Sequence, residues 1–199
     1  MGSLSWPALL SREQIQRFLR ACTGRTALRD RAMAQMLFDT GIRLGEALGL
    51  TTDAVLWDQG LLKVRGKGNK ERRVPITEDA LAALRSYMRR ERRPKTEADE
   101  PFVYLTYDGT ALVALNINFA NHFREIAKRA GLAKANPHMW RHTAATEMIR
   151  NGMSTAQVQR ALGHEHLSTT EIYLHLTDND VADAHRKASP LSNLLRNVR

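Results

Sequence analysis

The stretch that decides the fold is residues 136–142, which read Asn136-Pro137-His138-Met139-Trp140-Arg141-His142. An Asn just before a helix and a Pro in its first turn are typical of a helix start. His138 and Arg141 then lie on one face of that helix, near its positive end. Further along the chain come Leu162-Gly163-His164 and Tyr173. These side chains can all contact a phosphate, so the pattern predicts a basic pocket that binds an anion.

Composition favours a polyanionic partner. The 199 residues are 43% hydrophobic, which is enough to bury the core of a compact domain. Lys and Arg number 30 against 21 Asp and Glu, and the net charge of +9 is typical of proteins that bind nucleic acid. The single cysteine, Cys22, suits a reducing compartment. Since no apolar run approaches the ~18 residues of a membrane span, we expect a cytoplasmic protein without a membrane partner.

The N-terminal part has a helical pattern. Residues 11–21 read as a capped helix and residues 27–39 as a second one. The pattern breaks at Gly41 and restarts as a short helix, with Arg43 in its first turn and Glu46 three residues later. Arg43 is the only cation in a mostly apolar stretch, so we expect it to be paired or to face a site.

The pattern then changes to that of strands. Runs at 54–57, 61–65 and 71–76, separated by turns, predict a small antiparallel meander. Its second half is a basic finger, predicted to contact nucleic acid through Lys63, Arg65, Lys67, Lys70, Arg72 and Arg73. A short buried segment is expected at 102–105, and further helices at 78–93, 116–130, 136–151, 154–162, 168–174 and 178–187. The predicted fold class is α+β, mainly α-helical with a small three-stranded antiparallel sheet.

Four motifs follow one another along the chain: Thr40-Gly41-Ile42-Arg43-Leu44-Gly45-Glu46, Gly66-Lys67-Gly68-Asn69-Lys70-Glu71-Arg72, His138-Met139-Trp140-Arg141-His142, and Leu162-Gly163-His164 leading to Tyr173. Together they resemble the catalytic domain of the tyrosine recombinases, the phage-integrase and Xer-like site-specific DNA recombinases. The resemblance implies a catalytic domain over residues 9–188, with a tag or linker at 1–8 and a C-terminal tail at 189–199.

The resemblance also implies a mechanism. Tyr173 matches the nucleophile that attacks a DNA phosphodiester, giving a 3′-phosphotyrosine and a free 5′-hydroxyl without metal, other cofactor or ATP. His138 fits the assistance that a weakly ionised phenol needs, and Lys67 resembles the general acid for the leaving oxygen. Arg43 and Arg141 match two arginines that clamp the non-bridging oxygens.

Three further residues complete the expected site. His164 matches a position that hydrogen-bonds the scissile phosphate. Glu46 matches an acidic position that supports the site by orienting Arg43, and His142 is expected to brace the core or the site. No metal ligand is expected.

Three further functions are compatible with parts of this pattern. A metal-dependent hydrolase would use His138 and His142, at the spacing of a helical zinc pair, with ligands from residues 164–166. Against it, no glutamate follows His138 directly, and Arg141 would repel a cation. A DNA-binding module without cleavage is the second function, and a type IB topoisomerase-like relaxing enzyme is the third.

The resemblance also implies partners. The expected partner is double-stranded DNA in the bacterial cytoplasm or nucleoid. A homotetramer on that DNA would form if Leu191, Leu194 and Leu195 of the tail dock on a neighbouring protomer. Relatives usually carry an N-terminal core-binding domain, so the chain is expected to be either a fragment or a short stand-alone relative.

Overall fold

The computed structural model describes residues 9–66, 68, 70–133 and 135–163. The chain divides into two units, Met1–Ala144 and Ala145–Arg199. Several predicted features fall outside the described residues: the helices at 168–174 and 178–187, the tail at 189–199, and the site residues Lys67, His164 and Tyr173.

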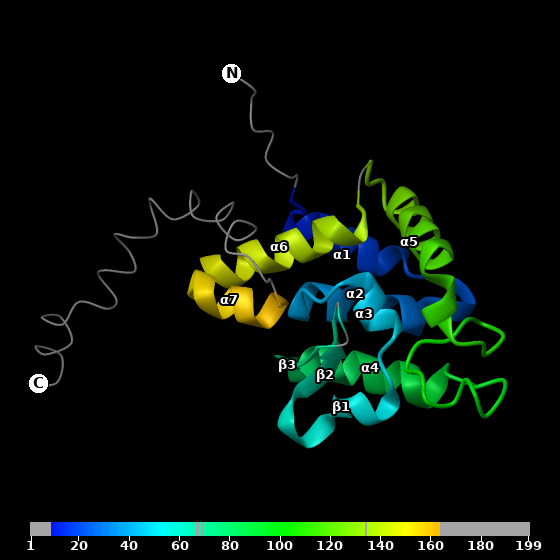
Figure 1. Ribbon diagram of the computed structural model, residues 1–199. Coiled ribbons are helices and arrows are strands. Elements are labelled where there is room, and N and C mark those ends of the chain that lie inside the picture. The colour runs from blue at the N-terminus through cyan, green and yellow to red at the C-terminus, as the bar shows by residue number, and fades with distance from the viewer. Residues whose placement is uncertain (1–8, 67, 69, 134, 164–199) are drawn as a thin grey trace, which may run out of the picture. The chain divides into compact units, whose positions relative to one another are not determined.

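Helices form most of the first unit (Figure 1). They are α1 (Arg12–Ala21), α2 (Ala27–Thr40), α3 (Leu44–Leu48), α4 (Glu78–Arg90), α5 (Asn116–Arg129) and α6 (Pro137–Arg150), of which α6 continues into the second unit. Short 3-10 turns join them: η1 (Gly24–Thr26), η2 (Thr52–Ala54), η3 (Trp57–Gln59) and η5 (Leu112–Leu115). The predicted cap of α1 is confirmed, because the Ser11 hydroxyl accepts the Gln14 N–H at 3.2 Å and the Gln14 side chain accepts the Ser11 N–H at 2.8 Å.

The predicted meander is confirmed as a three-stranded antiparallel sheet in the order β1 (Val55–Leu56), β2 (Leu61–Arg65), β3 (Glu71–Pro75). The first strand is shorter than predicted because its ends belong to η2 and η3. In the β2–β3 register Arg72 lies opposite Val64, and Val74 lies opposite Leu62. Since alternate residues of a strand share a face, Arg72 lies on the buried face of the sheet.

A hydrophobic core fills the first unit, and the start of α6 is anchored in it by Trp140. Trp140 has no exposed surface, and its ring lies 4.9 Å from Phe18 of α1, 5.6 Å from Phe123 of α5 and 6.4 Å from Phe38 of α2. Trp140 therefore fixes the rotation of the first half of α6.

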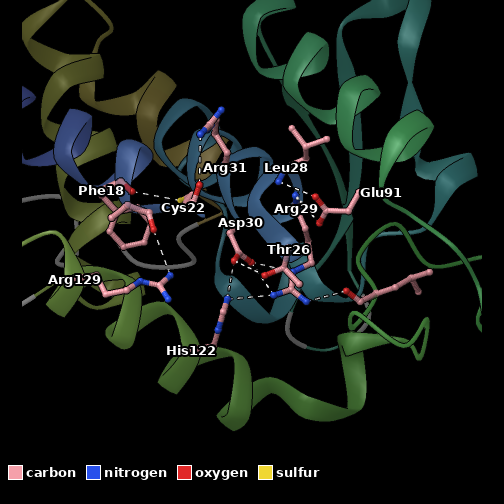
Figure 2. Close-up of polar contacts among 12 residues, drawn as sticks. Phe18, Cys22, Thr26, Leu28, Arg29, Asp30, Arg31, Glu91, His122 and Arg129 are labelled. Atoms are coloured by element: carbon pink, nitrogen blue, oxygen red, sulfur yellow. Dashed lines mark hydrogen bonds and ion pairs between the residues drawn. The ribbon is translucent and has the colours of Figure 1, made fainter. Parts of the chain in front are cut away.

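The start of α2 is capped from a distant part of the chain (Figure 2). The Glu91 carboxylate accepts the backbone N–H of Leu28 at 2.8 Å and that of Arg29 at 3.3 Å. Glu91 lies just beyond α4, which ends at Arg90, earlier than the predicted end at Arg93. The residue expected to continue α4 instead ties α4 to α2, which pack against each other.

Next to this cap, a buried ion cluster joins α2 to α5 (Figure 2). Asp30 has no exposed surface and accepts hydrogen bonds from Arg29 at 2.7 and 2.9 Å. His122 of α5 lies 2.7 Å from the other Asp30 oxygen. Burial alone raises the pKa of Asp30, but the His122 hydrogen bond and the Arg29 charge outweigh burial, and the pKa lies below its ordinary value.

The second unit is described up to residue 163. Ala145 and Ile149 of α6 pack against Val158 and Leu162 of α7 (Thr155–Leu162). Ser154 caps α7 as expected for the predicted helix at 154–162. In the part of the chain that the structure describes, no helix has the length and apolar character needed to cross a membrane.

Candidate active site

A cleft of about 700 Å³ opens in the first unit. It is lined by Arg43, Leu44, Gly45, Glu46, Arg65, Gly66, Ala120, Arg124, Asn136, Pro137, His138 and Arg141. The cleft thus brings together α3, the end of β2, α5 and the start of α6. Four of the residues predicted for the active site line it, namely Arg43, Glu46, His138 and Arg141.

The turn after α2 positions both predicted clamp arginines. Gly41 ends α2 with φ at 64°, in the left-handed region that favours glycine, and its N–H bonds the Leu37 carbonyl at 3.0 Å. The Gly41 carbonyl accepts a hydrogen bond from the Arg141 guanidinium at 2.6 Å. Because Arg141 is only 8% exposed, it is held against the turn that leads into Arg43.

The start of α6 carries the predicted histidine. The Asn136 side chain accepts the Met139 N–H at 3.0 Å, which confirms the cap at this helix start. His138 follows in the first turn and is exposed to the cleft, where the positive helix end favours an anion. His142 lies one turn further on; burial lowers its pKa, and the charges of His138 and Arg141 lower it further. His142 is therefore neutral near pH 7.

Glu46 is the centre of an ion cluster beside the cleft. Its side chain is only 6% exposed and accepts two hydrogen bonds from Arg72, at 2.8 and 2.9 Å. It also accepts the Arg43 backbone N–H at 2.8 Å and contacts the Arg43 guanidinium at 3.2 Å. Burial raises the pKa of Glu46, but the hydrogen bonds from Arg72 and Arg43 and their charges bring it below its ordinary value. Glu46 is therefore ionised at pH 7.

The residues predicted to contact DNA do not share one environment. Arg65, Lys70 and Arg73 are exposed, and Lys63 is half-buried. Arg65 also lies 3.8 Å from Glu71. Arg72 instead turns inward to Glu46. The alternation of Arg72 with the apolar Val74 and Ile76 is the sequence signal that could have predicted this orientation.

Arg124 of α5 was not predicted at all, although it lines the cleft. Nothing in the local pattern distinguishes it from any exposed cation on an amphipathic helix. Only the packing of α5 beside α3 brings it to the site.

The ligands considered for a metal-dependent hydrolase are only partly described. Within residues 9–163, as far as the structure describes them, no three His, Cys, Asp or Glu side chains are grouped closely enough to hold a metal ion. His138 and His142 belong to this part, whereas residues 164–166 lie outside it.

Comparison with known proteins gives a consistent result. Residues 8–180 match the model of the phage integrase family. The tyrosine recombinase XerC of Lacticaseibacillus casei (strain BL23) is 35% identical over 193 residues, which are 94% of this chain and 64% of that protein. The chain therefore spans a little under two thirds of this curated relative.

Two solved structures extend the comparison. The crystal structure of XerA recombinase aligns with a TM-score of 0.76 at 29% identity, over 96% of this chain and 66% of that one. The XerH site-specific recombinase bound to palindromic difH substrate, in a post-cleavage complex, aligns with a TM-score of 0.72 at 26% identity, over 92% and 53%. Both the sheet and the helical arrangement are thus those of recombinases of known structure.

Proposed function

The chain belongs to the phage integrase family, and from that premise we propose that it cleaves and rejoins double-stranded DNA at a specific site through a covalent bond to Tyr173. The observation that carries the proposal is the cleft in which Arg43, His138 and Arg141 meet. The cleft combines two guanidinium groups and a helix N-terminus, which together suit a phosphodiester. The similar proteins are named as recombinases, which does not favour a topoisomerase or a module that binds DNA without cleaving it.

In this proposal the two arginines hold the scissile phosphate. A phosphoryl transition state carries its charge on the non-bridging oxygens, and donors fixed in advance stabilise that charge most. Arg141 is fixed by the Gly41 carbonyl and Arg43 by Glu46. Both guanidinium groups are thus held at the cleft by protein acceptors in the structure without DNA.

Cleavage then requires two proton transfers. The Tyr173 hydroxyl gives its proton to His138 and its oxygen bonds phosphorus, while the bond from phosphorus to the 5′ oxygen breaks. Lys67 supplies a proton to that leaving oxygen. At pH 7 a phenol of pKa about 10 is only ~0.1% ionised, a handicap of roughly 4 kcal/mol, so proton removal and the cationic cleft are both needed. The reverse sequence reseals the strand, and His164 adds a hydrogen bond to the phosphate.

The test is a nicked suicide DNA substrate, from which the cleaved fragment diffuses away and leaves a covalent protein–DNA adduct. We expect an adduct with the wild type, also in the presence of a chelator, and none with Tyr173→Phe. Tyr107→Phe is the matched control, because Tyr107 is 75% exposed and outside the cleft, and this variant should form adduct normally. An adduct retained by Tyr173→Phe would exclude this nucleophile, and no adduct from the wild type on any candidate site would contradict the function.

Recombination, as opposed to relaxation, requires exchange between two DNA sites. We further propose that four copies assemble on DNA in the bacterial cytoplasm through the tail at 189–199. Deleting residues from Ser189 onward should then weaken assembly in gel-shift assays while cleavage of a single strand is retained. Relaxation of a plasmid with one site, without exchange between two, would instead indicate topoisomerase activity.

A further inference from the structure

Arg72 belongs by sequence to the basic finger, but its side chain faces Glu46. We propose that Arg72 is a positioning residue, which neutralises Glu46 so that the Arg43 guanidinium remains available to the DNA phosphate. This inference rests on the proposed function, in which Arg43 clamps the phosphate.

The geometry makes Arg72 the principal counter-ion of Glu46. Arg72 donates to both carboxylate oxygens, at 2.8 and 2.9 Å, in the parallel arrangement that gives the strongest arginine–carboxylate pairs. The Arg43 side chain makes one longer contact, of 3.2 Å. The Arg72 side chain is 17% exposed and that of Arg43 46%. The inner arginine is therefore bound to the carboxylate, and the outer one faces the cleft.

The charge balance explains why the inner arginine is needed. A buried carboxylate without a partner is costly, so it recruits any cation in reach. If Arg72 were removed, Arg43 would be left in contact with Glu46, and the carboxylate would compete with the phosphate for it. With Arg72 present, two cations share one carboxylate and the cluster keeps a net positive charge at the cleft.

The hairpin holds Arg72 in this orientation. Its position opposite Val64 and its alternation with Val74 put the side chain on the buried face of the sheet. Gly66 covers the ion pair, because a Cβ built there would lie 3.4 Å from an Arg72 nitrogen and 3.5 Å from a Glu46 oxygen. The Gly66 N–H also bonds the Lys70 carbonyl at 2.9 Å. Hairpin backbone thus shields the pair from water, which strengthens it.

The competing interpretation is that Arg72 contacts DNA directly, like its neighbours in the finger. A double-mutant cycle separates the two. If Arg72 acts only through Glu46, its removal should matter only while Glu46 is charged. If Arg72 contacts DNA, the two substitutions should act independently.

The experiment measures the single-turnover rate of adduct formation on the nicked substrate at saturating protein, for the wild type, Arg72→Gln, Glu46→Gln and the double variant. We expect Arg72→Gln to slow the reaction by about tenfold or more, which is a usual loss when a residue that orients a catalytic side chain is removed. In the Glu46→Gln background, Arg72→Gln should change the rate by less than about twofold. Arg72→Lys, which keeps the charge but not the paired geometry, should be intermediate.

Controls separate the possible failures. Arg90→Gln removes one charge from an exposed position at the end of α4 and should react like the wild type. If Arg72→Gln does not fold, comparing Glu46→Gln with the double variant still tests for a direct DNA contact, because neither variant contains a buried unpaired carboxylate. A loss of more than about twofold on removing Arg72 there would overturn the inference. Equal effects of Arg72→Gln in both backgrounds, or a wild-type rate for Arg72→Gln, would overturn this inference alone. An absence of adduct from the wild type would instead refute the proposed function.

Discussion

Two clusters in the first unit each place one carboxylate between two basic side chains. The scaffold cluster consists of Arg29, Asp30 and His122, and the cleft cluster consists of Arg43, Glu46 and Arg72. In both, burial raises the pKa of the carboxyl group and the surrounding donors bring it below its ordinary value. The clusters use the same chemistry, yet one lies inside the fold and the other beside the cleft.

The two clusters differ in the other contacts of one arginine, which is Arg29 in the scaffold cluster and Arg43 in the cleft cluster. In the scaffold cluster, the Arg29 side chain is only 6% exposed, and it bonds Asp30 on one side and the Leu105 carbonyl at 3.1 Å on the other. In the cleft cluster, the Arg43 side chain is 46% exposed and makes a single side-chain contact to Glu46. An arginine that donates hydrogen bonds to protein acceptors on both sides stabilises the fold. An arginine that is partly exposed beside a neutralised carboxylate can instead bind a ligand.

The largest expected effect is the loss of stability when the scaffold cluster is broken. Asp30→Asn leaves the buried Arg29 guanidinium without its charge partner, and losing one member of a buried pair costs about 3–5 kcal/mol of unfolding free energy. Urea denaturation measures the loss. Asp58→Asn, at an exposed position, is the control and should change stability by less than about 0.5 kcal/mol. A similar small loss for Asp30→Asn would show that the scaffold cluster does not stabilise the fold.

Removing the exposed arginine of the cleft cluster should affect the chemistry rather than the stability. Arg43→Ala removes one donor to the transition state, which costs on the order of 10²–10³ in the rate of adduct formation. Because the Arg43 side chain is about half exposed, the unfolding free energy should change by less than about 1 kcal/mol. Parallel measurements of rate and denaturation test both parts. A large loss of stability with an unchanged rate per folded molecule would reverse the roles assigned to the two clusters.

Low pH should reduce the contribution of the scaffold cluster to the stability of the fold. The pKa of Asp30 is lower in the folded protein than its ordinary value of 3.8. A carboxyl group with a lowered folded pKa contributes its full stability above the ordinary value, and loses it as pH falls through the folded pKa. The stability difference between wild type and Asp30→Asn should therefore be constant near neutral pH and narrow below about pH 4. A difference that stays constant as the pH falls to about 2.5 would contradict the assigned charge state.

Much of the fold follows from local sequence signals. Ser11 with Gln14, Gly41 and Ser154 mark helix ends that the structure reproduces, and the turn residues delimit the three strands. These signals work because caps and turns depend on neighbours in the chain. The early end of α4 was missed because the Glu91 carboxylate caps a helix that is distant in sequence.

The site is predictable where motif residues face the cleft, and less so where they do not. Arg43, His138 and Arg141 were expected together, and they line one cleft. Charge alone predicts that Arg72 contacts DNA, whereas strand alternation places it on the buried face of the sheet with Val74. Arg124 could not be found from the sequence, since its place depends on packing between helices.

The smallest expected effect is on the salt dependence of DNA affinity and concerns Arg73. This arginine is exposed next to Arg72 on β3 and belongs to neither cluster. If Arg73 contacts a phosphate, Arg73→Gln should reduce the slope of log affinity against log salt by about 0.9, because one fewer counterion is released. In the Glu46→Gln background, where no carboxylate competes with the phosphate for Arg43, Arg72→Gln should leave the slope unchanged, whereas Arg73→Gln should still reduce it. Fluorescence anisotropy between about 50 and 200 mM salt, a range in which phosphate contacts change affinity strongly, measures both slopes. Equal reductions for the two variants in the Glu46→Gln background would mean that Arg72 contacts a DNA phosphate as Arg73 does, and alternation along β3 would then not distinguish a phosphate contact from an internal counter-ion.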